Sequence, residues 1–312
     1  MQQTSGIILL NKPVGISSNS AVNKVKYLIK AKRAGHLGTL DPLASGVLPV
    51  TFGKATKLFD YFLTKEKTYK ATFVFGFSTD TLDSEGKVEK VEDVDILENQ
   101  IEKILGQFIG KIRQLPPKYS ALKINGQKAY DLVRSGKEVN LESRLIEVKS
   151  ITFERAQNIE NLKNFFFEHS KDEKIEENRV KIENSFKNCF NFEINCGAGT
   201  YIRSLCRDIA AALGTVGTMV GLERTKCGKF EIENCVSFSD IEKGNFKVVS
   251  PNEAVDLAIL EISKEETKKL LCGQAVFKNF EGQKKLICDE EFLGIASSKN
   301  GKIKIDTYLK EE

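Results

Sequence analysis

The sequence predicts an α+β fold with a small β module at its C-terminal end. Residues 67–77 and 191–196 alternate apolar and polar side chains with the period of a half-buried strand. Residues 18–29 and 202–213 instead repeat apolar side chains at the spacing of a helix packed on a core. Beyond Pro251 the chain changes to short strand-like runs. We therefore expect a central sheet flanked by helices, followed by a separate small β unit.

Composition bounds the class of protein. The 312 residues, 41% hydrophobic and 29% charged, suffice for one large domain and a small one, which we divide into 1–250 and 251–312. No apolar run could span a bilayer and no signal pattern begins the chain, so we expect a cytoplasmic protein without membrane contact. The seven cysteines include no CxxC pair and the chain has only two histidines, so we expect reduced thiols and no metal site.

The net charge of +4 conceals an uneven distribution. Residues 1–70 carry eleven lysines and arginines against three acidic residues, which leaves the remainder of the chain slightly acidic. A solvated surface is the ordinary explanation of a charged run. A one-sided excess around a polar loop instead favours a polyanionic partner, and nucleic acid is the obvious one. The cations on and just beyond the first helix are Lys24, Lys26, Lys30, Lys32 and Arg33.

The expected elements follow in order along the chain. Pro13 and Gly15 force a turn between the first strand and the first helix, and an Asn-Gly pair at 125–126 marks a hairpin. The strands are expected at 6–10, 46–51, 67–77, 145–153, 191–196, 286–289, 292–296 and 302–307, and the helices at 18–29, 54–62, 96–105, 128–135, 202–213 and 262–271.

Residues 157–190 interrupt this pattern. They hold seven acidic and six basic residues and a run of three phenylalanines, with no glycine or proline. Such a density of charge favours helices with a solvated face, or partial disorder. The sequence leaves the role of this charged stretch open.

The stretch GHLGTLDPLASG at 35–46 is the one around which the chain is organised. Its three glycines and its Asp-Pro step exclude a regular helix or strand, so we expect an ordered loop between a helix and a strand. The loop presents His36 and Asp41, and rigid loops with polar side chains are frequent sites of chemistry. Asp41 could equally serve the turn, because Asp readily hydrogen-bonds the backbone of its own turn.

Two further positions carry polar groups at the ends of elements. Arg203 falls in the first turn of a helix, off its apolar face, and such a helix N-terminus is a ready anion site. Tyr69 is the first residue of the apolar face of its expected strand. It could be one more aromatic residue of the core, or its hydroxyl could lie at the edge of a cleft. Asp80 and Asp83 in the following turn lack the additional ligands that a metal would need.

These segments resemble the TruB family of tRNA pseudouridine synthases. The loop at 35–46 resembles the family's catalytic loop, in which the Asp is the nucleophile. Each segment alone is a weak signal, but their joint occurrence in family order across residues 11–230 is highly specific. The other matching segments are KPVGISS at 12–18, KTYK at 67–70, YSALKINGQKAY at 119–130, GTYIRSL at 199–205 and LERT at 222–225.

The resemblance implies a pseudouridine synthase fold, with a central mixed, mostly antiparallel sheet flanked by helices. It also implies an RNA-gripping insert at about 108–150 and a PUA-like RNA-binding module in 251–312. A packing extension of the main domain stays open as the alternative for 251–312. Shorter family members pass almost directly from the preceding strand to the GTYIRSL motif, which makes 157–190 an insertion of about thirty residues.

The implied activity is isomerisation of uridine-55 in the T loop of tRNA to pseudouridine, by base flipping and an Asp nucleophile. Asp41 is the implied nucleophile, Arg203 its partner, and Tyr69 the residue stacked on the base. The rearrangement needs no external reactant and no redox change, so we expect no cofactor; we also expect a monomer without an obligatory protein partner. The implied substrate-binding residues are Lys12, Tyr201, Leu222 and His36. Lys12 would contact RNA phosphates, Tyr201 belongs to the GTYIRSL motif, and Leu222 would line the uridine pocket. His36 would fill the gap that the flipped uridine leaves in the stack of RNA bases.

Several alternatives stay open. Attack of Asp41 on C1′, attack on C6 and a glycal route all fit these residue types. A non-catalytic tRNA-binding or tRNA-folding protein on the same scaffold would keep the basic face without needing Asp41. A guide-RNA-dependent relative with protein partners is disfavoured by the short C-terminal region, and an rRNA-type synthase by HLGTLD where those enzymes resemble HRLD.

Overall fold

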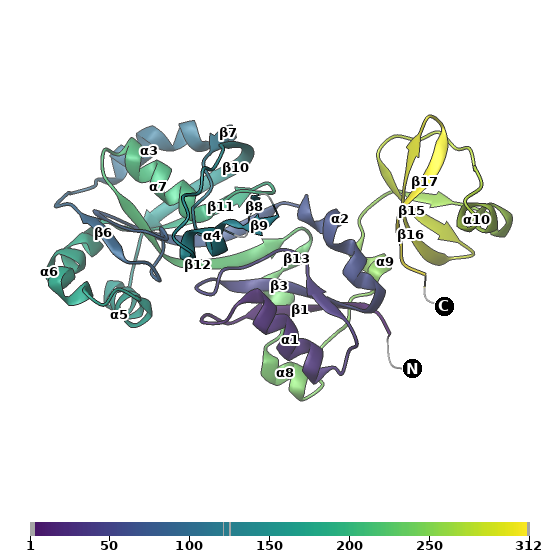
Figure 1. Ribbon diagram of the computed structural model, residues 1–312, viewed down its shortest axis with the longest axis horizontal. Coiled ribbons are helices and arrows are strands. Elements are labelled where there is room, and N and C mark those ends of the chain that lie inside the picture. The colour runs from purple at the N-terminus through teal and green to yellow at the C-terminus, as the bar shows by residue number, and fades with distance from the viewer. Residues whose placement is uncertain (1–3, 121, 125, 311–312) are drawn as a thin grey trace.

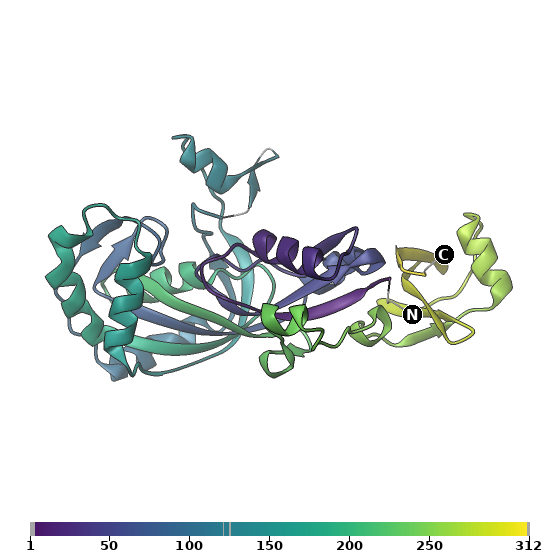
Figure 2. The ribbon, with the colours of Figure 1, turned by 90° about the horizontal axis from the view of Figure 1, so that it is seen from below.

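The computed structural model describes residues 4–120, 122–124 and 126–310 (Figure 1). The molecule is elongated, with a large sheet in the middle, a pair of helices at one end and a small β module at the other (Figures 1 and 2). In this described part of the chain, no helix combines the length and the apolar character that crossing a membrane requires.

The large sheet confirms the predicted mixed, mostly antiparallel arrangement. Its strands are β1 (Gly6–Lys12), β2 (Ala34–His36), β3 (Ser45–Phe52), β4 (Lys67–Phe75), β7 (Gly110–Gln114), β10 (Arg144–Arg155), β11 (Cys189–Cys196), β12 (Gly217–Cys227) and β13 (Phe230–Glu231). They lie in the order β1-β3-β12-β4-β11-β10-β7, with β2 beside β3 and β13 beside β12. The pairing of β3 with β12 is parallel, whereas the neighbouring pairs are antiparallel.

One face of this sheet is covered by three helices, α1 (Ser18–Leu28), α3 (Glu98–Leu105) and α7 (Ile202–Ala212). The apolar stripe of α1 packs on β1 and β3 in one cluster, and α3 and α7 pack on β4, β10 and β11 in another. Tyr69 and Leu222 contact both clusters, so they mark the boundary between the two halves of this face.

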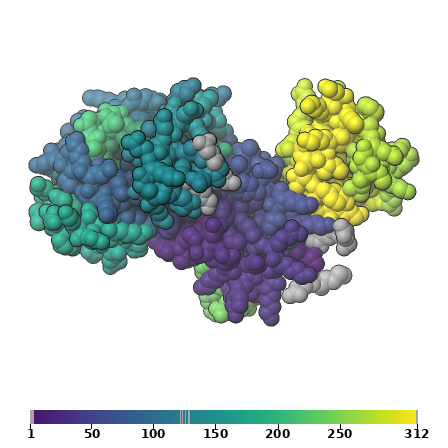
Figure 3. Space-filling model, viewed as in Figure 1, coloured from purple at the N-terminus to yellow at the C-terminus, as the bar shows by residue number. Residues whose placement is uncertain are grey.

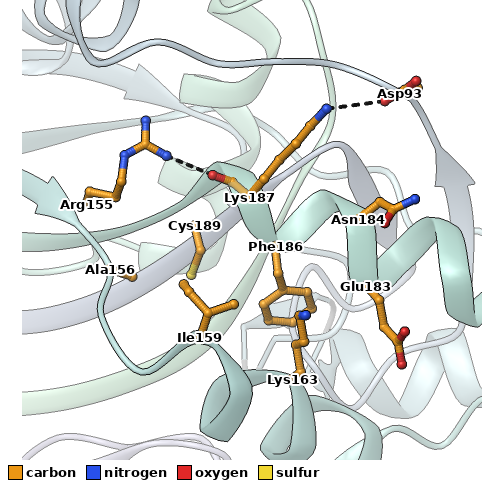
Figure 4. A pocket seen from close by; sticks show the side chains of 10 residues that line it. All are labelled: Asp93, Arg155, Ala156, Ile159, Lys163, Glu183, Asn184, Phe186, Lys187 and Cys189. Atoms are coloured by element: carbon orange, nitrogen blue, oxygen red, sulfur yellow. Dashed lines mark hydrogen bonds and ion pairs between the residues drawn. The ribbon is translucent and has the colours of Figure 1, made fainter.

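The insertion at 157–190 forms two helices, α5 (Ile159–His169) and α6 (Ile175–Ser185), on the opposite face of the sheet. Phe166, Ile182 and Phe186 are fully buried there against side chains of β4 and β12. The expected solvated face is present, but the insertion is also part of a core. Arg155 and Lys187 line a surface hollow beside the insertion (Figure 4). There the Arg155 guanidinium donates to the Lys187 carbonyl, and the Lys187 ammonium pairs with Asp93.

Several elements differ from the predictions. The helix expected at 54–62 begins as a 3-10 turn, η1 (Gly53–Leu58), before α2 (Phe59–Leu63). The long strand expected at 67–77 bends at Gly76, whose φ is 111°, and continues as β5 (Phe77–Thr79), which pairs with β6 (Val88–Val91). The first residues of the expected loop form β2 on the edge of β3.

A projecting arm follows β7 and stands out from the sheet (Figure 2). It contains β8 (Lys123–Ile124), β9 (Gln127–Lys128) and α4 (Ala129–Arg134), within the segment expected to grip RNA. Of the predicted hairpin pair, Asn125 lies outside the described residues, and Gly126 has the positive φ, 84°, that such a turn favours.

The C-terminal module is a separate four-stranded sheet, β14 (Ile259–Glu261), β15 (Gln283–Cys288), β16 (Glu291–Lys299) and β17 (Lys302–Tyr308), with helix α10 (Lys264–Leu271). It forms a distinct lobe (Figure 3). Ile295 and Leu309 pack in one cluster with Ala55 and Leu58, so the lobe is docked on the body next to η1.

We predict that Phe166→Ala lowers the free energy of unfolding by about 3–5 kcal/mol, the usual cost of emptying a core aromatic site. Its ring is fully buried and lies 5.0 Å from the ring of Phe77 and 6.1 Å from that of Phe186. Val180→Ala on α6 is the control, because Val180 is 70% exposed. Urea unfolding measures both; equal stability of the two variants would mean that the insertion is only a surface appendage.

Candidate active site

The loop at 37–44 is held on one side by a buried arginine on β12. Arg224 is 1% exposed, and its guanidinium donates to the carbonyls of Val47 at 2.8 Å, Thr39 at 3.2 Å and Gly38 at 3.0 Å. Gly46 lets β12 approach, because a Cβ there would lie 2.3 Å from the Arg224 carbonyl oxygen. The loop is thus tied to the centre of the sheet.

On its other side the loop is held by the N-terminal segment. The Ser18 hydroxyl donates to the Leu40 carbonyl at 2.7 Å and accepts from the Leu40 amide at 2.8 Å. The Pro42 carbonyl accepts from the Gly15 amide at 2.9 Å and from the Lys12 ammonium at 3.4 Å. These bonds bracket Asp41, whose side chain is 35% exposed, so the loop presents a carboxylate on a restrained backbone.

Asp41 pairs with Arg203, as the sequence predicted, with Nη2 2.9 Å from Oδ2. The same guanidinium lies 3.3 Å from Asp83 and donates to the carbonyls of Thr81 at 3.0 Å and Tyr119 at 3.1 Å. Its side chain is only 7% exposed. A guanidinium fixed by four partners can orient a carboxylate, because its planar fork leaves it little freedom.

Asp83 is a member of the site that sequence reasoning missed. It is buried, accepts from the Thr81 hydroxyl at 2.6 Å and from the Glu85 amide at 3.1 Å, and contacts Arg203. Burial raises the pKa of Asp83, and the Arg203 guanidinium opposes that rise. The turn at 78–86 is similar to a TDTxDxxG segment of the family that the sequence resembles, but that similarity gave Asp83 no role. A metal site there was rejected from the sequence, and the described residues contain no cluster suited to a metal ion.

Tyr69 lies on β4 directly opposite Arg224 of β12. It is half-buried at the boundary of the two clusters. Burial raises the pKa of the Tyr69 hydroxyl to about 12, although the nearby Arg224 guanidinium opposes the shift. The hydroxyl therefore carries its proton at neutral pH. Arg224 thus connects Tyr69 with the loop that carries Asp41.

The other predicted substrate-contacting residues lie around this centre. His36 ends β2 just before the loop, and burial, followed by the Arg224 charge, lowers its pKa below its usual value. Its Nδ1 is buried without a hydrogen-bond partner among the described residues. Tyr201 caps α7, with its amide donating to Gln114 at 2.9 Å. Leu222 is half-buried on β12, two residues before Arg224.

The prediction that Lys12 binds phosphates is wrong. Its side chain is 0% exposed, and its ammonium donates to the carbonyls of Pro13 at 2.7 Å and Ile16 at 2.8 Å in addition to Pro42. Burial lowers the pKa of Lys12 to about 8. A lysine at the end of a strand ordinarily keeps its ammonium in water, and nothing local in the sequence signals that the turn at 13–16 folds over this one. Lys12 supports the loop instead.

Comparisons with known proteins find related sequences over most of the chain. A profile described as "TruB family pseudouridylate synthase (N terminal domain)" matches residues 26–175, and one described as "tRNA pseudouridylate synthase B C-terminal domain" matches 203–260. A Clostridium tetani protein named tRNA pseudouridine synthase B is 41% identical over 244 residues, which cover 78% of this chain and 74% of that protein. A Caulobacter protein of the same name is 36% identical over 279 residues, covering 87% and 81%.

Solved structures share the fold at lower identity. An H/ACA RNP bound to a substrate RNA containing 2′-deoxyuridine matches with a TM-score of 0.68 at 20% identity, covering 100% of this chain and 87% of that one. A Cbf5-Nop10-Gar1 complex matches with a TM-score of 0.67 at 22% identity, covering 98% and 85%. At this level of identity the similarity establishes the fold.

We predict that the buried Lys12 ammonium makes stability depend on pH. Its pKa is about 8 in the folded protein and about 10.5 when unfolded. Between these values only the unfolded chain holds the proton, so the free energy of unfolding should rise as the pH increases from 8 to 10. Lys12→Met should lack this component. Urea unfolding of both proteins across that range measures the difference, and parallel pH profiles would contradict the assignment.

Proposed function

Because this chain belongs to the TruB family of pseudouridylate synthases, we propose that it isomerises uridine to pseudouridine in tRNA, at uridine-55 of the T loop. The observation that carries the proposal is the ion pair of Asp41 and Arg203, in which Oδ2 and Nη2 lie 2.9 Å apart. Asp41 belongs to a loop that is restrained from both sides. A surface that only bound RNA would have no need of a carboxylate held in this way.

The reaction exchanges one bond to the ribose for another. The bond between N1 of uracil and C1′ breaks, the base turns, and C5 bonds to C1′; C5 loses a proton and N1 gains one. No atom is added or removed and no electron is transferred. The chain therefore has to supply a nucleophile or charge partner, a surface that holds the detached base, and a means of moving a proton.

Asp41 is proposed as the nucleophile. Support comes from its class of side chain, its partial exposure and its ion pair with Arg203. Arg203 is proposed to keep this carboxylate ionised and aimed, with Asp83 and two backbone carbonyls holding the guanidinium from behind. This arrangement fixes the nucleophile before substrate arrives, which reduces the cost of orienting it during the reaction.

Tyr69 and Leu222 are proposed to hold the base. Both lie at the boundary between the clusters of α1 and α7, and Tyr69 offers an aromatic face beside a hydroxyl. With a pKa of about 12, this hydroxyl would act as a proton donor, because the phenolate is negligible at neutral pH. Tyr201, at the start of the helix that carries Arg203, is proposed to contact the same nucleotide.

The base must leave a folded RNA loop before it can react. Extrusion costs a few kcal/mol, which contacts in the vacated stack can offset. His36 is proposed to fill that stack, since it lies on β2 immediately before the Asp41 loop and its lowered pKa keeps the ring neutral. The projecting arm around α4 is proposed to grip the RNA from the other side.

We propose that the enzyme acts as a monomer without an obligatory protein partner, in the cytoplasm, where tRNA is found. The 41% identity to a tRNA pseudouridine synthase B, against 20% to the protein of an H/ACA assembly, supports this reading. The division into a catalytic domain of residues 1–250 and a PUA-like RNA-binding module of 251–312 belongs to the same proposal, and is supported by the separate sheet β14–β17.

Asp41→Asn should abolish pseudouridine formation while leaving tRNA affinity close to that of the parent. The amide is nearly isosteric but is neutral and a poor nucleophile. Single-turnover assays on unmodified tRNA, with pseudouridines mapped at single-base resolution, measure the rate; filter binding measures the affinity. Asp60→Asn is the control, because it removes a charge from an exposed position on α2. Comparable turnover by the Asp41 variant would rule out Asp41 as the nucleophile, whereas tRNA binding without any turnover by the parent protein would favour a non-catalytic tRNA-binding protein.

Arg203→Lys should slow the single-turnover rate roughly a hundredfold, because a lysine cannot reproduce the planar contacts and a nucleophile displaced by about an ångström reacts that much more slowly. The melting temperature and tRNA affinity should change little. Arg207→Lys is the matched control on the same helix, since among the described residues Arg207 pairs only with the adjacent Asp208 and a backbone carbonyl. Equal rates for the two variants would remove Arg203 from the proposed site.

A further inference from the structure

The outer face of α1 carries an aromatic ring that the proposed reaction does not use. Tyr27 is 80% exposed, the most exposed of the large apolar side chains in the described part of the chain. It lies opposite the buried stripe of the helix, which consists of Ser18, Ala21, Val22 and Val25. Packing therefore gives no reason for an aromatic residue at this position.

Two lysines lie beside this ring. Lys26 and Lys30 border the same surface hollow as Tyr27, with Glu242 at its edge. Neither lysine, nor Lys32 or Arg33 just beyond the helix, forms an ion pair with any described carboxylate. No acidic residue occurs between positions 4 and 40. Exposed cations interleaved with an aromatic ring are typical of surfaces that bind unpaired nucleotides.

The position of α1 relates this surface to the reacting centre. The helix covers the same face of the sheet that carries Tyr69 and Leu222, and its first turn holds the Asp41 loop through Ser18. Tyr27, however, is at the far end of the helix and on its outer side. RNA held at Asp41 would have to extend past α1 to reach Tyr27.

We infer that the outer face of α1 is a second RNA-contact surface, on which Tyr27 stacks against an unpaired base of the tRNA outside its T stem-loop while Lys26 and Lys30 hold the neighbouring phosphates. This inference rests on the proposed function for the identity of the RNA. Stacking is indifferent to base identity, so this contact adds affinity for the intact tRNA body and does not select the reacting uridine.

The test compares two RNAs, full-length unmodified tRNA and the isolated T stem-loop. Tyr27→Ala should weaken binding of the full-length tRNA on the order of tenfold, the scale of one lost base stack, and leave binding of the stem-loop unchanged. Tyr27→Phe keeps the aromatic face and should bind both RNAs like the parent. Lys26→Gln/Lys30→Gln should reduce the salt dependence of binding for the full-length tRNA alone. Val180→Ala/Lys181→Ala on α6 is the matched surface control and should change neither affinity.

Equal loss of affinity for both RNAs after Tyr27→Ala would overturn the inference, because Tyr27 would then contact the T stem-loop itself. No loss for either RNA would also overturn it, leaving the surface to another acidic partner or to solvent. Turnover of the isolated stem-loop by the parent protein separates the two proposals: its absence would count against the proposed function, whereas the affinity ratio of the two RNAs reports on Tyr27.

Discussion

The constraint on which the rest of the site depends is the burial of Arg224 without an ion-pair partner among the described residues. A buried guanidinium is costly unless each donor finds an acceptor, and here the acceptors are backbone carbonyls of β3 and of the loop at 38–39. The loop therefore turns the carbonyls of Gly38 and Thr39 toward Arg224, while the Asp41 side chain stays partly exposed. The same arginine lies opposite Tyr69 on β4, and its backbone passes close to Gly46 of β3, so one buried charge joins the loop to the centre of the sheet.

Sequence reasoning succeeded where the signal is local. Periodicity placed α1, α7 and most strands within a few residues. The polar loop and the helix N-terminus marked Asp41 and Arg203 as candidates, and the family resemblance predicted that the two would pair. It failed where a long-range contact decides the outcome. The central strand β12 was not predicted, because it is paired along both sides and lacks simple alternation. Lys12 ends a strand and Asp83 lies in a turn, and both are removed from water by contacts that the local pattern does not signal: the turn at 13–16 and Pro42 for Lys12, and Arg203 for Asp83.

The insertion illustrates how composition misleads. Its even mixture of acidic and basic residues predicts a solvated pair of helices, and many of these charges do pair with one another or lie exposed, as Arg179 does with Glu176 and Glu183. Yet every third or fourth position faces the sheet, where aromatic rings cover the side opposite Asp41. The high average charge content of the segment therefore conceals a narrow apolar stripe, which is enough to cover one face of the sheet.

The parallel pair of β3 and β12 has a consequence for biosynthesis. Residues 45–52 leave the ribosome long before residues 217–227, yet β12 is inserted between β3 and β4. Until it arrives, the nascent chain carries two unpaired strand edges in the middle of its future sheet, each able to recruit the wrong strand. Of the proposed catalytic pair, Asp41 is synthesised before this delay and Arg203 shortly before β12 ends it. The proposed active site can thus form only after most of the chain has been translated. Misassembly or chaperone capture would occur before that point, while the two halves of the sheet are still unjoined.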